Sequence, residues 1–284
     1  MAIIINGNKI SQDIRHEIKE KALRLTEDRG ITPGLAVILV GEDPASQIYV
    51  SKKKDDCEEV GFFSREFRLP DNTKEGHLLT IIDELNKAPE IHGILVQLPL
   101  PKHINPNAIL DAIDPRKDVD GFHPYNMGRL FTGDPFHQAC TPLGIIELLN
   151  RHSIGIEGKD AVIVGRSNIV GKPLAMMFLI RHATVTVCHT RTRNLTEVTQ
   201  RAEILVAAAG STEMIKGNMV REGAVVIDVG INRSKDGKLV GDVAFSEVVE
   251  KTSYITPVPG GVGPMTRAML LSNTFDAAAR FGKP

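Results

Sequence analysis

Apolar runs alternate with amphipathic stretches along most of the chain. Residues 35–40 are a continuous apolar run, as expected for a strand buried on both faces of a sheet, and residues 91–98 are predicted to be the next buried strand. Residues 62–69 instead alternate between apolar and polar side chains, which is typical of a half-buried strand. Helices are expected to begin at residues that can cap them, namely Ser11, Ser46 and Thr73. This alternation of helices and strands predicts an α/β domain with a parallel sheet.

A second α/β unit follows a stretch without clear periodicity. Residues 114–141 are rich in Pro, Gly, Asp and aromatic side chains, and we interpret them as a long functional loop at the edge of a domain. Four short apolar strands follow, at residues 160–164, 184–188, 204–208 and 224–229. A last helix, residues 266–281, is expected to pack back on the first domain. The predicted domains are residues 1–138 with 265–284, and residues 139–264.

The composition supports a globular protein and excludes several classes. The chain has 284 residues, 42% of them apolar and 24% charged, with a formal net charge of −1. That balance supplies a core and argues against nucleic-acid binding through a broad basic face. Cys57, Cys140 and Cys188 lack the close spacing of a metal or redox motif, so we expect reduced thiols and no metal site. The apolar run at residues 3–5 is too short for a membrane segment, and we expect a cytoplasmic protein without a membrane partner.

The second domain contains a strand, a tight turn and a helix of the kind that binds phosphate groups. Gly165 follows the apolar strand directly, and the turn runs through Arg166 and Ser167 to Gly171. A Gly after a strand lets the backbone approach a phosphate, and the helix that follows offers free N–H groups and the positive end of its dipole. The spacing differs from Gly-x-Gly-x-x-Gly, so a simple tight turn is the alternative.

The next strand indicates which dinucleotide binds. NAD enzymes place an Asp or Glu near this point to bind the ribose 2′-hydroxyl group. Here the strand ends in His189-Thr190-Arg191-Thr192-Arg193, which contains no carboxylate. Arg166 and Arg191 are therefore our candidates for binding a 2′-phosphate, and NADP is the predicted cofactor. The alternative is that both arginines are solvated surface residues.

Candidate chemistry in the first domain begins with Tyr49 and Lys53, which lie one helical turn apart. Cys57 and Val60 continue that face, so Lys53 is expected to lie along a partly apolar stripe. Desolvation lowers the pKa of a lysine, which can then act as a base or proton donor near neutral pH. The alternative is that Lys53 extends past the edge of the core into water. Gln97, at a strand end, could orient a water or a carbonyl, or only bond to the backbone.

Three loop segments are further candidates. Asp118-Val119-Asp120-Gly121 lies in the long loop, where a carboxylate beside Gly either binds a ligand or only makes a turn. Residues 257–264 are rigid, small and almost without side-chain donors, which suits a flat wall for an aromatic ligand or a hinge. Residues 228–232 end a strand, where the nicotinamide half of a cofactor is expected.

Together these segments resemble the bifunctional methylenetetrahydrofolate dehydrogenase/methenyltetrahydrofolate cyclohydrolase family over nearly the whole chain. Two departures from the family pattern are Ala139 before Cys140, where Pro is common, and Arg267, where an apolar residue is expected. The matching motifs are Gly41-Glu-Asp-Pro-Ala-Ser-Gln-Ile-Tyr49 with Lys53, Gly93-Ile-Leu-Val-Gln-Leu-Pro-Leu-Pro101, Asp118-Val-Asp-Gly-Phe-His-Pro124, Gly165-Arg-Ser-Asn-Ile-Val-Gly-Lys-Pro173 and Pro257-Val-Pro-Gly-Gly-Val-Gly-Pro-Met-Thr266.

The resemblance implies an N-terminal catalytic domain, a Rossmann-like NADP-binding domain, a folate cleft between them and a homodimer. It implies oxidation of 5,10-methylenetetrahydrofolate with NADP, then hydrolysis to 10-formyltetrahydrofolate, in the one-carbon metabolism that serves purine, histidine and methionine biosynthesis. Lys53 is the implied key catalytic residue and Gln97 assists it, while Tyr49 packs against the folate rings and Asp120 binds the pterin edge. The other residues implied or expected to bind substrate are Val96, Leu98, Pro259, Gly260 and Gly261. Those implied to bind cofactor are Gly165, Arg166, Ser167, Thr190 and Ile231.

Two other functions fit part of the pattern. Tyr49 and Lys53 have the spacing of the proton-donor pair of short-chain dehydrogenases, but here they precede the cofactor turn, whereas that fold places them after it. A nucleotide-sensing or scaffold protein with a decayed site is the non-enzymatic alternative. The joint presence of Tyr49, Lys53, Gln97 and Asp120 argues against decay.

Overall fold

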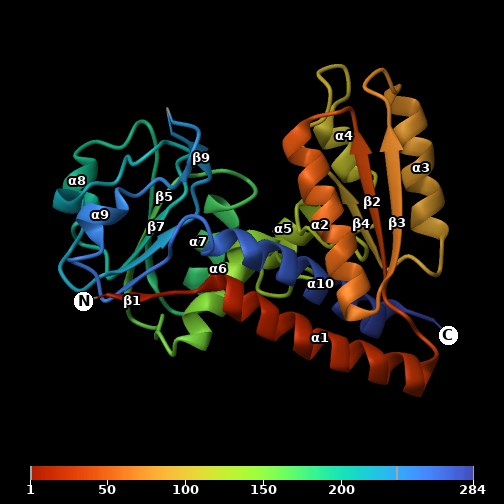
Figure 1. Ribbon diagram of the computed structural model, residues 1–284, viewed down its shortest axis with the longest axis horizontal. Helices are drawn as coiled ribbons and strands as arrows, with labels where there is room; N and C mark the ends of the chain where they lie inside the picture. The colour runs from red at the N-terminus through yellow and green to blue at the C-terminus, as the bar shows by residue number, and fades with distance from the viewer. Residues whose placement is uncertain (1, 235, 284) are drawn as a thin grey trace. The chain divides into compact units, whose positions relative to one another are not determined.

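The computed structural model describes residues 2–234 and 236–283, which form two compact units (Figure 1). Residues 12–140 and those from 267 onward form one of them, which we call the three-strand unit after its sheet. Residues up to 11 and residues 141–266 form the other, the six-strand unit. Each unit is described by itself.

The three-strand unit is built on a parallel sheet in the order β3-β2-β4. Strand β2, Gly34–Val40, is buried at every residue and pairs with β3, Phe63–Leu69, on one side and β4, Gly93–Val96, on the other. Helix α3, Glu75–Lys87, packs Leu78, Ile81, Ile82 and Leu85 into a core shared with β2 and β4. Helix α2, Pro44–Val60, contacts β2 and β3, and Figure 1 shows α2 and α3 on either side of these strands. Helices on both faces explain why the central strand is apolar throughout.

Three helices begin elsewhere than the sequence predicted. Helix α1 spans Gly7–Arg29, so Ser11 lies inside it and donates its hydroxyl hydrogen to a backbone carbonyl at 2.9 Å. Helix α2 is capped by Asp43, whose carboxylate accepts the N–H of Ser46 at 2.8 Å. Helix α3 begins two residues after Thr73, whose hydroxyl also bonds to a nearby carbonyl. The predicted caps were wrong for two reasons. The hydroxyl groups of Ser11 and Thr73 donate to nearby backbone carbonyls, and Ser46 lies inside the first turn of α2.

The stretch predicted as a long loop, residues 114–141, contains a short helix, α5 (Pro124–Phe131). Another short helix, α4 (Pro106–Asp111), lies between β4 and that stretch. Each has a Pro in its first turn, where the missing N–H leaves no intrahelical bond unmade. Helix α6, Cys140–Arg151, begins directly afterwards. The last helix, α10, spans Val262–Phe281 and therefore starts four residues before the predicted position.

The six-strand unit contains a parallel sheet in the order β1-β11-β8-β7-β5-β6. Its strands are β1 (Ile3–Ile4), β5 (Asp160–Val164), β6 (Thr184–Cys188), β7 (Ile204–Ala207), β8 (Val225–Asp228) and β11 (Tyr254–Ile255). The core of this unit includes buried side chains of the inner strands, among them Val162, Leu205 and Val226. Because the strands are parallel, the loops that follow them leave from one edge of the sheet.

Short elements complete the six-strand unit. Helix α7, Gly171–Ile180, connects β5 to β6 and buries most of its residues. The remaining elements are α8 (Leu195–Thr199), a 3₁₀ helix (Gly217–Met219), α9 (Phe245–Val248) and the antiparallel pair β9 (Asn232–Arg233) and β10 (Leu239–Val240).

The predicted α/β architecture is confirmed. The strands predicted at residues 160–164 and 184–188 have those bounds, and the residues of α10 from 267 onward belong to the three-strand unit, as the returning C-terminal helix required. The proposed boundaries at residues 138/139 and 264/265 stay predictions. Among the described residues, no helix combines the length and apolar character needed to cross a membrane.

Candidate functional site

Lys53 and Gln97 are brought together at the end of β4. Helix α2 carries Lys53 one turn after Tyr49, and the Lys53 amine donates a hydrogen bond of 3.0 Å to the side-chain oxygen of Gln97. The Gln97 amide nitrogen donates to the carbonyl of Leu98 at 2.8 Å. Gln97 therefore bonds to the backbone, which is one of the two alternatives for it, and its side-chain oxygen accepts from Lys53. The other alternative, that it orients a water or a carbonyl, stays a prediction. The acceptor offered to Lys53 is a neutral amide.

Burial sets the proton affinity of Lys53. Its side chain is partly buried, whereas its neighbours Lys52 and Lys54 are exposed, as the predicted apolar stripe requires. Burial lowers the pKa of Lys53, because the charged form loses hydration. Asp120 opposes that shift, and it stands first among the charges that raise the pKa of Lys53. Burial also raises the pKa of Asp120, while Lys53 lowers it, so the two groups titrate as a coupled pair.

Asp118 and Asp120 have different tasks in the loop they share. The Asp118 carboxylate is buried and accepts the N–H groups of Phe122 and His123 at 3.2 and 2.9 Å, and the side-chain amide of Asn126 at 2.8 Å. Asp118 is thus the carboxylate that makes the turn. Asp120 lies in the field of Lys53, and its carboxyl group also has a side-chain hydrogen bond with Cys140. Its backbone carbonyl accepts the N–H of Cys140 at 3.3 Å.

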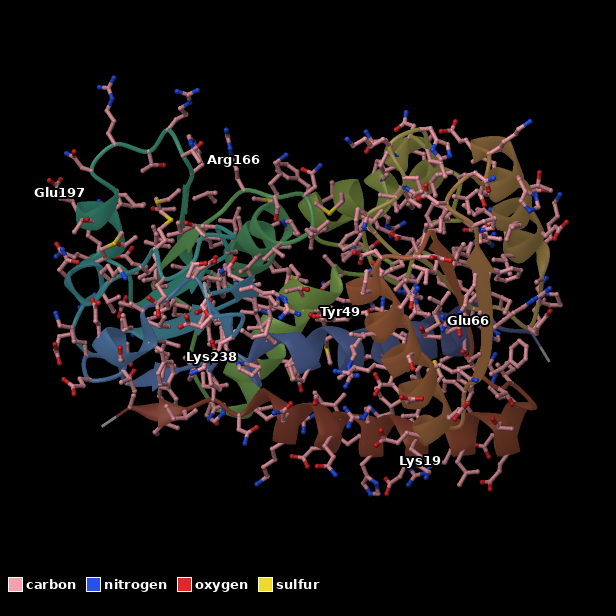
Figure 2. All side chains as sticks on the ribbon, turned by 45° about the horizontal axis from the view of Figure 1, so that its top comes forward. Lys19, Tyr49, Glu66, Arg166, Glu197 and Lys238 are labelled. Carbon is pink, nitrogen blue, oxygen red and sulfur yellow. The ribbon has the colours of Figure 1, made fainter. Side chains whose placement is uncertain are left out.

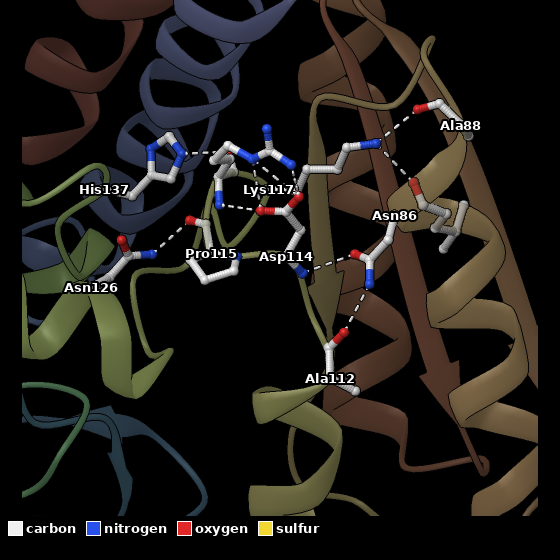
Figure 3. Close-up of polar contacts among 10 residues, drawn as sticks. Asn86, Ala88, Ala112, Asp114, Pro115, Lys117, Asn126 and His137 are labelled. Atoms are coloured by element: carbon white, nitrogen blue, oxygen red, sulfur yellow. Dashed lines mark hydrogen bonds and ion pairs between the residues drawn. The ribbon is translucent and has the colours of Figure 1, made fainter.

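The loop that carries Asp120 is held from several sides (Figure 3). On one side, Lys117 donates to two carbonyl groups at the end of α3, at 2.9 and 2.7 Å. Asn86 of α3 accepts the N–H of Asp114 at 2.9 Å and donates to the carbonyl of Ala112 at 2.8 Å. On the other side, a ring nitrogen of His137 lies 2.8 Å from the carbonyl oxygen of Arg116. These bonds fix the loop and with it the position of Asp120.

Helix α10 supports the same loop through Asn273. Its side-chain amide donates to the carbonyl groups of Val119 and Gln138 at 2.8 and 2.9 Å. Gly121 has a φ of 75°, and a Cβ there would lie 2.5 Å from the backbone nitrogen of Ala139, so only Gly fits this approach. Asn273 was not predicted from the sequence, and Asp118 was named only as part of a candidate loop segment. The available signal for Asn273 was one amide in a largely apolar stretch of helix.

Arg267 forms an ion pair with a carboxylate in the three-strand unit, which explains why a charged residue fits at this position. Its Nε lies 3.3 Å from Oδ2 of the buried Asp56, which is on α2 three residues after Lys53. Arg15 lies 3.9 Å from the other carboxylate oxygen. Burial raises the pKa of Asp56, and the two arginines lower it. Arg267 is also among the charges that lower the pKa of Lys53.

The turn after β5 has the close backbone packing that a phosphate site needs. Gly165 has a φ of 139°, and a Cβ there would lie 2.1 Å from the carbonyl oxygen of Ala208. A Cβ on Gly171, at the start of α7, would lie 2.1 Å from the carbonyl oxygen of Gly165. The Ser167 hydroxyl accepts the N–H groups of Val170 and Gly171 at 3.1 and 3.4 Å. The turn therefore brings its backbone close to the start of α7, where the Ser167 side chain bonds to the first N–H groups.

The loops after β5 and β6 add positive charge at one edge of the sheet. These strands are neighbours, and the N–H of Gly165 donates to the carbonyl of Cys188 at 2.9 Å. Arg166, Thr190 and Arg191 are exposed, and Figure 2 shows the Arg166 side chain extending away from the ribbon. The loop at residues 189–193 contains no carboxylate. A close backbone turn with two nearby arginines fits the phosphate groups of NADP.

The remaining predicted residues lie in the six-strand unit after β8 and β11. Ile231 is 53% exposed and directly precedes β9. The carbonyl of Gly260 accepts the N–H of Asn8 at 3.2 Å, and a Cβ on Gly7 would lie 1.8 Å from the carbonyl oxygen of Gly261. Residues 257–261 are therefore packed against the start of α1, which favours the wall over the hinge.

The structure thus groups the predicted residues into two sets. Lys53, Gln97 and Asp120 come together in the three-strand unit, with Tyr49 exposed on α2 and Val96 and Leu98 flanking Gln97. The cofactor residues come together at the ends of β5, β6 and β8 in the six-strand unit. The role of each residue stays a prediction. Within residues 2–234 and 236–283, no group of three or more His, Cys, Asp or Glu side chains is arranged to hold a metal ion.

Two family models match the chain. The tetrahydrofolate dehydrogenase/cyclohydrolase catalytic domain matches residues 5–120, and the NAD(P)-binding domain of the same family matches residues 139–281. A curated relative, the bifunctional protein FolD of Moorella thermoacetica, is 59% identical over 279 residues, which is 98% of this chain and 99% of that protein.

Solved structures agree with this assignment. The bifunctional enzyme FolD of Campylobacter jejuni matches with a TM-score of 0.96 and 51% identity, covering 98% of this chain and 99% of that one. The Trypanosoma brucei enzyme, solved with NADP and an inhibitor, matches with a TM-score of 0.93 and 38% identity, covering 98% of each chain. The sequence motifs, the two α/β units and these comparisons agree: the chain belongs to the tetrahydrofolate dehydrogenase/cyclohydrolase family.

Proposed function

We propose that this protein oxidises 5,10-methylenetetrahydrofolate to 5,10-methenyltetrahydrofolate with NADP, and then hydrolyses that product to 10-formyltetrahydrofolate. Membership of the family supports both activities. The observation that carries the proposal is a partly buried lysine, Lys53, whose amine bonds to the neutral amide of Gln97 and lies in the field of Asp120. A short-chain dehydrogenase or a nucleotide sensor needs no such group in a separate α/β unit.

The dehydrogenase step is mainly a problem of position. The substrate carbon lies between two nitrogen atoms, whose lone pairs stabilise the cation that remains when hydride leaves. Bound NADP would supply the hydride acceptor. The residues of the chain then have to bind the phosphates, through Gly165, Arg166 and Ser167, and hold the ring systems in contact. Arg191 and Thr190 would bind the adenosine side, because no carboxylate there repels a 2′-phosphate.

Hydrolysis needs proton transfer, which we assign to Lys53. The neutral amine takes a proton from the water as its oxygen bonds to the methenyl carbon. The resulting ammonium gives that proton to the ring nitrogen N5 as the bond between this carbon and N5 breaks, and the hydroxyl proton leaves as the formyl group forms. A lowered pKa lets one lysine do both tasks. Gln97 orients the amine throughout.

Substrate orientation is assigned to Asp120 and Tyr49. A carboxylate can accept two N–H bonds from the amidine-like edge of a pterin, which is a geometry that specifies both position and ring orientation. The loop bonds described above would hold Asp120 ready for that contact. Tyr49 is 39% exposed on the same helix as Lys53 and offers an aromatic face to the folate rings.

Two assays test the function directly. Purified protein is mixed with 5,10-methylenetetrahydrofolate and either NADP or NAD, and cofactor reduction is followed by absorbance. Separately, the loss of methenyltetrahydrofolate is followed without any cofactor. We expect reduction of NADP at least about tenfold more efficient than that of NAD, and cofactor-independent hydrolysis. No reduction of either dinucleotide would refute the dehydrogenase, and no hydrolysis above the buffer rate would refute the cyclohydrolase.

We also infer that the protein is a homodimer that pairs through the β6 edge of its larger sheet. In the part of the chain that the structure describes, strand β6 lies at the end of its sheet beside β5, and Val187 on it is exposed. Leu179 and Ile180, at the end of α7, are exposed as well. Light scattering should give twice the mass of one chain, and Val187→Lys should give a single-chain mass. The control is Leu23→Lys, on exposed α1 surface, which should stay dimeric. A monomeric wild-type protein would contradict the inference.

A cytoplasmic location is the last part of the proposal. The three cysteines, Cys57, Cys140 and Cys188, are buried free thiols, which suits a reducing compartment. Fractionation of cells that produce the protein should recover it with cytoplasmic markers. Recovery in an extracytoplasmic or membrane fraction would count against this location.

A further inference from the structure

Two short motifs of the six-strand unit each contain one Asp and one Gly, and they pack against each other. Asp228-Val229-Gly230 ends β8, and Gly241-Asp242-Val243 follows β10. The Asp228 carboxylate accepts the N–H groups of Gly230 and Asp242 on one oxygen, both at 2.9 Å, and that of Val243 on the other at 3.0 Å. We call these two motifs, residues 228–230 and 241–243, the carboxylate clasp.

Asp242 extends the clasp to a second loop. Its carboxylate accepts the N–H groups of Ala209, Gly210 and Ser211 at 2.6, 2.9 and 2.8 Å. It also accepts the side-chain amide of Asn232 at 2.8 Å. These partners lie in the loop after β7 and directly after Ile231. One buried carboxylate thus fixes the ends of two neighbouring strands.

The two glycines make the interlock possible. A Cβ on Gly230 would lie 2.4 Å from Oδ1 of Asp242, and a Cβ on Gly241 would lie 1.8 Å from Oδ2 of Asp228. Asp228 is 4% exposed and Asp242 is fully buried, so neither carboxylate can turn into water. Buried carboxylates are tolerated when several N–H groups bond to them, as happens here. Each glycine therefore leaves the space that the aspartate of the other motif occupies.

A third loop joins the same cluster. The hydroxyl of Thr256 accepts the N–H of Asp228 at 2.7 Å, and Thr256 directly precedes the rigid segment at residues 257–261. Strands β7, β8 and β11 are neighbours in the sheet, so all three loops leave its carboxyl edge. In sheets of this kind the nicotinamide half of a dinucleotide lies at that edge.

We propose that Asp228 and Asp242 are positioning residues for hydride transfer. The clasp fixes Ile231 and the loop at residues 209–211 at the place where the nicotinamide ring binds. The phosphate turn at residues 165–167 packs against Ala208, whose N–H donates to the carbonyl of Val164 and not to the clasp. This inference rests on the proposed dehydrogenase function. Loosening the clasp moves the acceptor ring relative to the substrate, and hydride transfer is far more sensitive to such a shift than binding is. The cyclohydrolase residues belong to the other unit.

The decisive variant is Asp242→Asn in the full chain. Asn has one oxygen where Asp has two, so its NH₂ group must face either the N–H groups of Ala209 and Gly210 or the N–H of Ser211 and the side-chain amide of Asn232. Single-turnover hydride transfer should fall at least about tenfold. NADP affinity should change less than about threefold, and methenyltetrahydrofolate hydrolysis less than about twofold. The primary deuterium isotope effect with substrate labelled at the methylene carbon should increase, because hydride transfer becomes more rate-limiting.

Controls separate this role from a general effect on folding. Asp160→Asn removes an exposed carboxylate at the opposite end of β5 and should leave all four measurements unchanged. If Asp242→Asn does not fold, Asn232→Ala removes one hydrogen-bond donor to the Asp242 carboxylate. It should show the same pattern, with hydride transfer reduced about threefold. The inference is overturned if hydride transfer in the folded variant stays within twofold of wild type, or if all activities and NADP affinity fall in parallel. A wild-type protein without dehydrogenase activity would instead overturn the proposed function.

Discussion

At the scale of single residues, the proposed function assigns the proton transfers of hydrolysis to Lys53. Lys53→Met removes the proton carrier but keeps the length of the side chain, so cyclohydrolase activity should fall by at least about 100-fold. Dehydrogenase activity should remain, because hydride transfer needs no proton carrier. The control is Lys52→Met, which changes an exposed lysine on the same turn of α2. A Lys53→Met enzyme that hydrolyses methenyltetrahydrofolate at the wild-type rate would remove this residue from its role.

The choice of cofactor is a second residue-scale prediction. Arg191→Glu should reduce the ratio of NADP to NAD efficiency by about tenfold or more, because a carboxylate repels the 2′-phosphate and can bind a ribose hydroxyl. Arg193→Glu makes the same charge change two residues away in the same loop and should affect the ratio much less. The measurement is kcat/KM with each dinucleotide. An unchanged ratio in Arg191→Glu would leave Arg166 as the residue that selects NADP.

Single residues also mark what the sequence could and could not predict about the site. The sequence could predict the Tyr49 and Lys53 pair, and the Gly165 turn after an apolar strand, because each depends only on a local pattern. The bond between Lys53 and Gln97 joins residues 44 positions apart, and no local pattern contains it. The same holds for Arg267 and Asp56, where a charge that looked out of place in an apolar helix has a buried partner on another helix.

At the scale of elements, the loop of Asp118 should make stability depend on pH. Burial raises the pKa of Asp118 to about 7, although three hydrogen-bond donors favour its charged form. A carboxyl group whose pKa is higher in the folded state binds its proton more tightly there, so its contribution to stability is full below about pH 4 and is lost as pH rises to about 7. Asp118→Asn lacks this titration.

The test compares denaturant unfolding of wild type and Asp118→Asn between pH 4 and 8. The free energy of unfolding of wild type should decline relative to the variant by up to about 4 kcal/mol over this range. Other carboxyl groups, including Asp228, are common to both proteins and cancel in the difference. A difference that stays constant with pH would show that the hydrogen bonds of Asp118 outweigh its burial.

Elements also differ in how well they could be predicted. The apolar strands were readable because a strand inside a parallel sheet is covered on both faces and must be apolar throughout. The helix starts at residues 7 and 44 were missed, because Ser11 and Ser46 also suit a cap, while the true cap of α2 is a carboxylate three residues earlier. Helix α5 was not predicted because residues 114–141 have a Pro and Gly content that is typical of loops.

At the scale of the whole molecule, the two activities should be separable and then recoverable by mixing. Lys53→Met should retain oxidation, and Asp242→Asn should retain hydrolysis, because their residues belong to different units. A mixture of the two variants should convert methylenetetrahydrofolate to 10-formyltetrahydrofolate, with methenyltetrahydrofolate accumulating transiently, since it must pass through solution. The measurement is the absorbance of methenyltetrahydrofolate over time. Each variant alone is the control, and a mixture no faster than the sum of both would contradict the prediction.

The close contacts of Gly230 with Asp242 and of Gly241 with Asp228 also predict how these positions evolve. The three atoms nearest to a Cβ on Gly241 all belong to the Asp228 carboxyl group, whereas a Cβ on Gly230 would also lie 2.5 Å from the backbone nitrogen of Asp242. A lineage can therefore replace Gly241 once residue 228 becomes shorter, while Gly230 stays restricted whatever residue stands at 242. Across distant relatives, residues 228 and 241 should change together, and Gly230 should persist even where the surrounding surface has diverged.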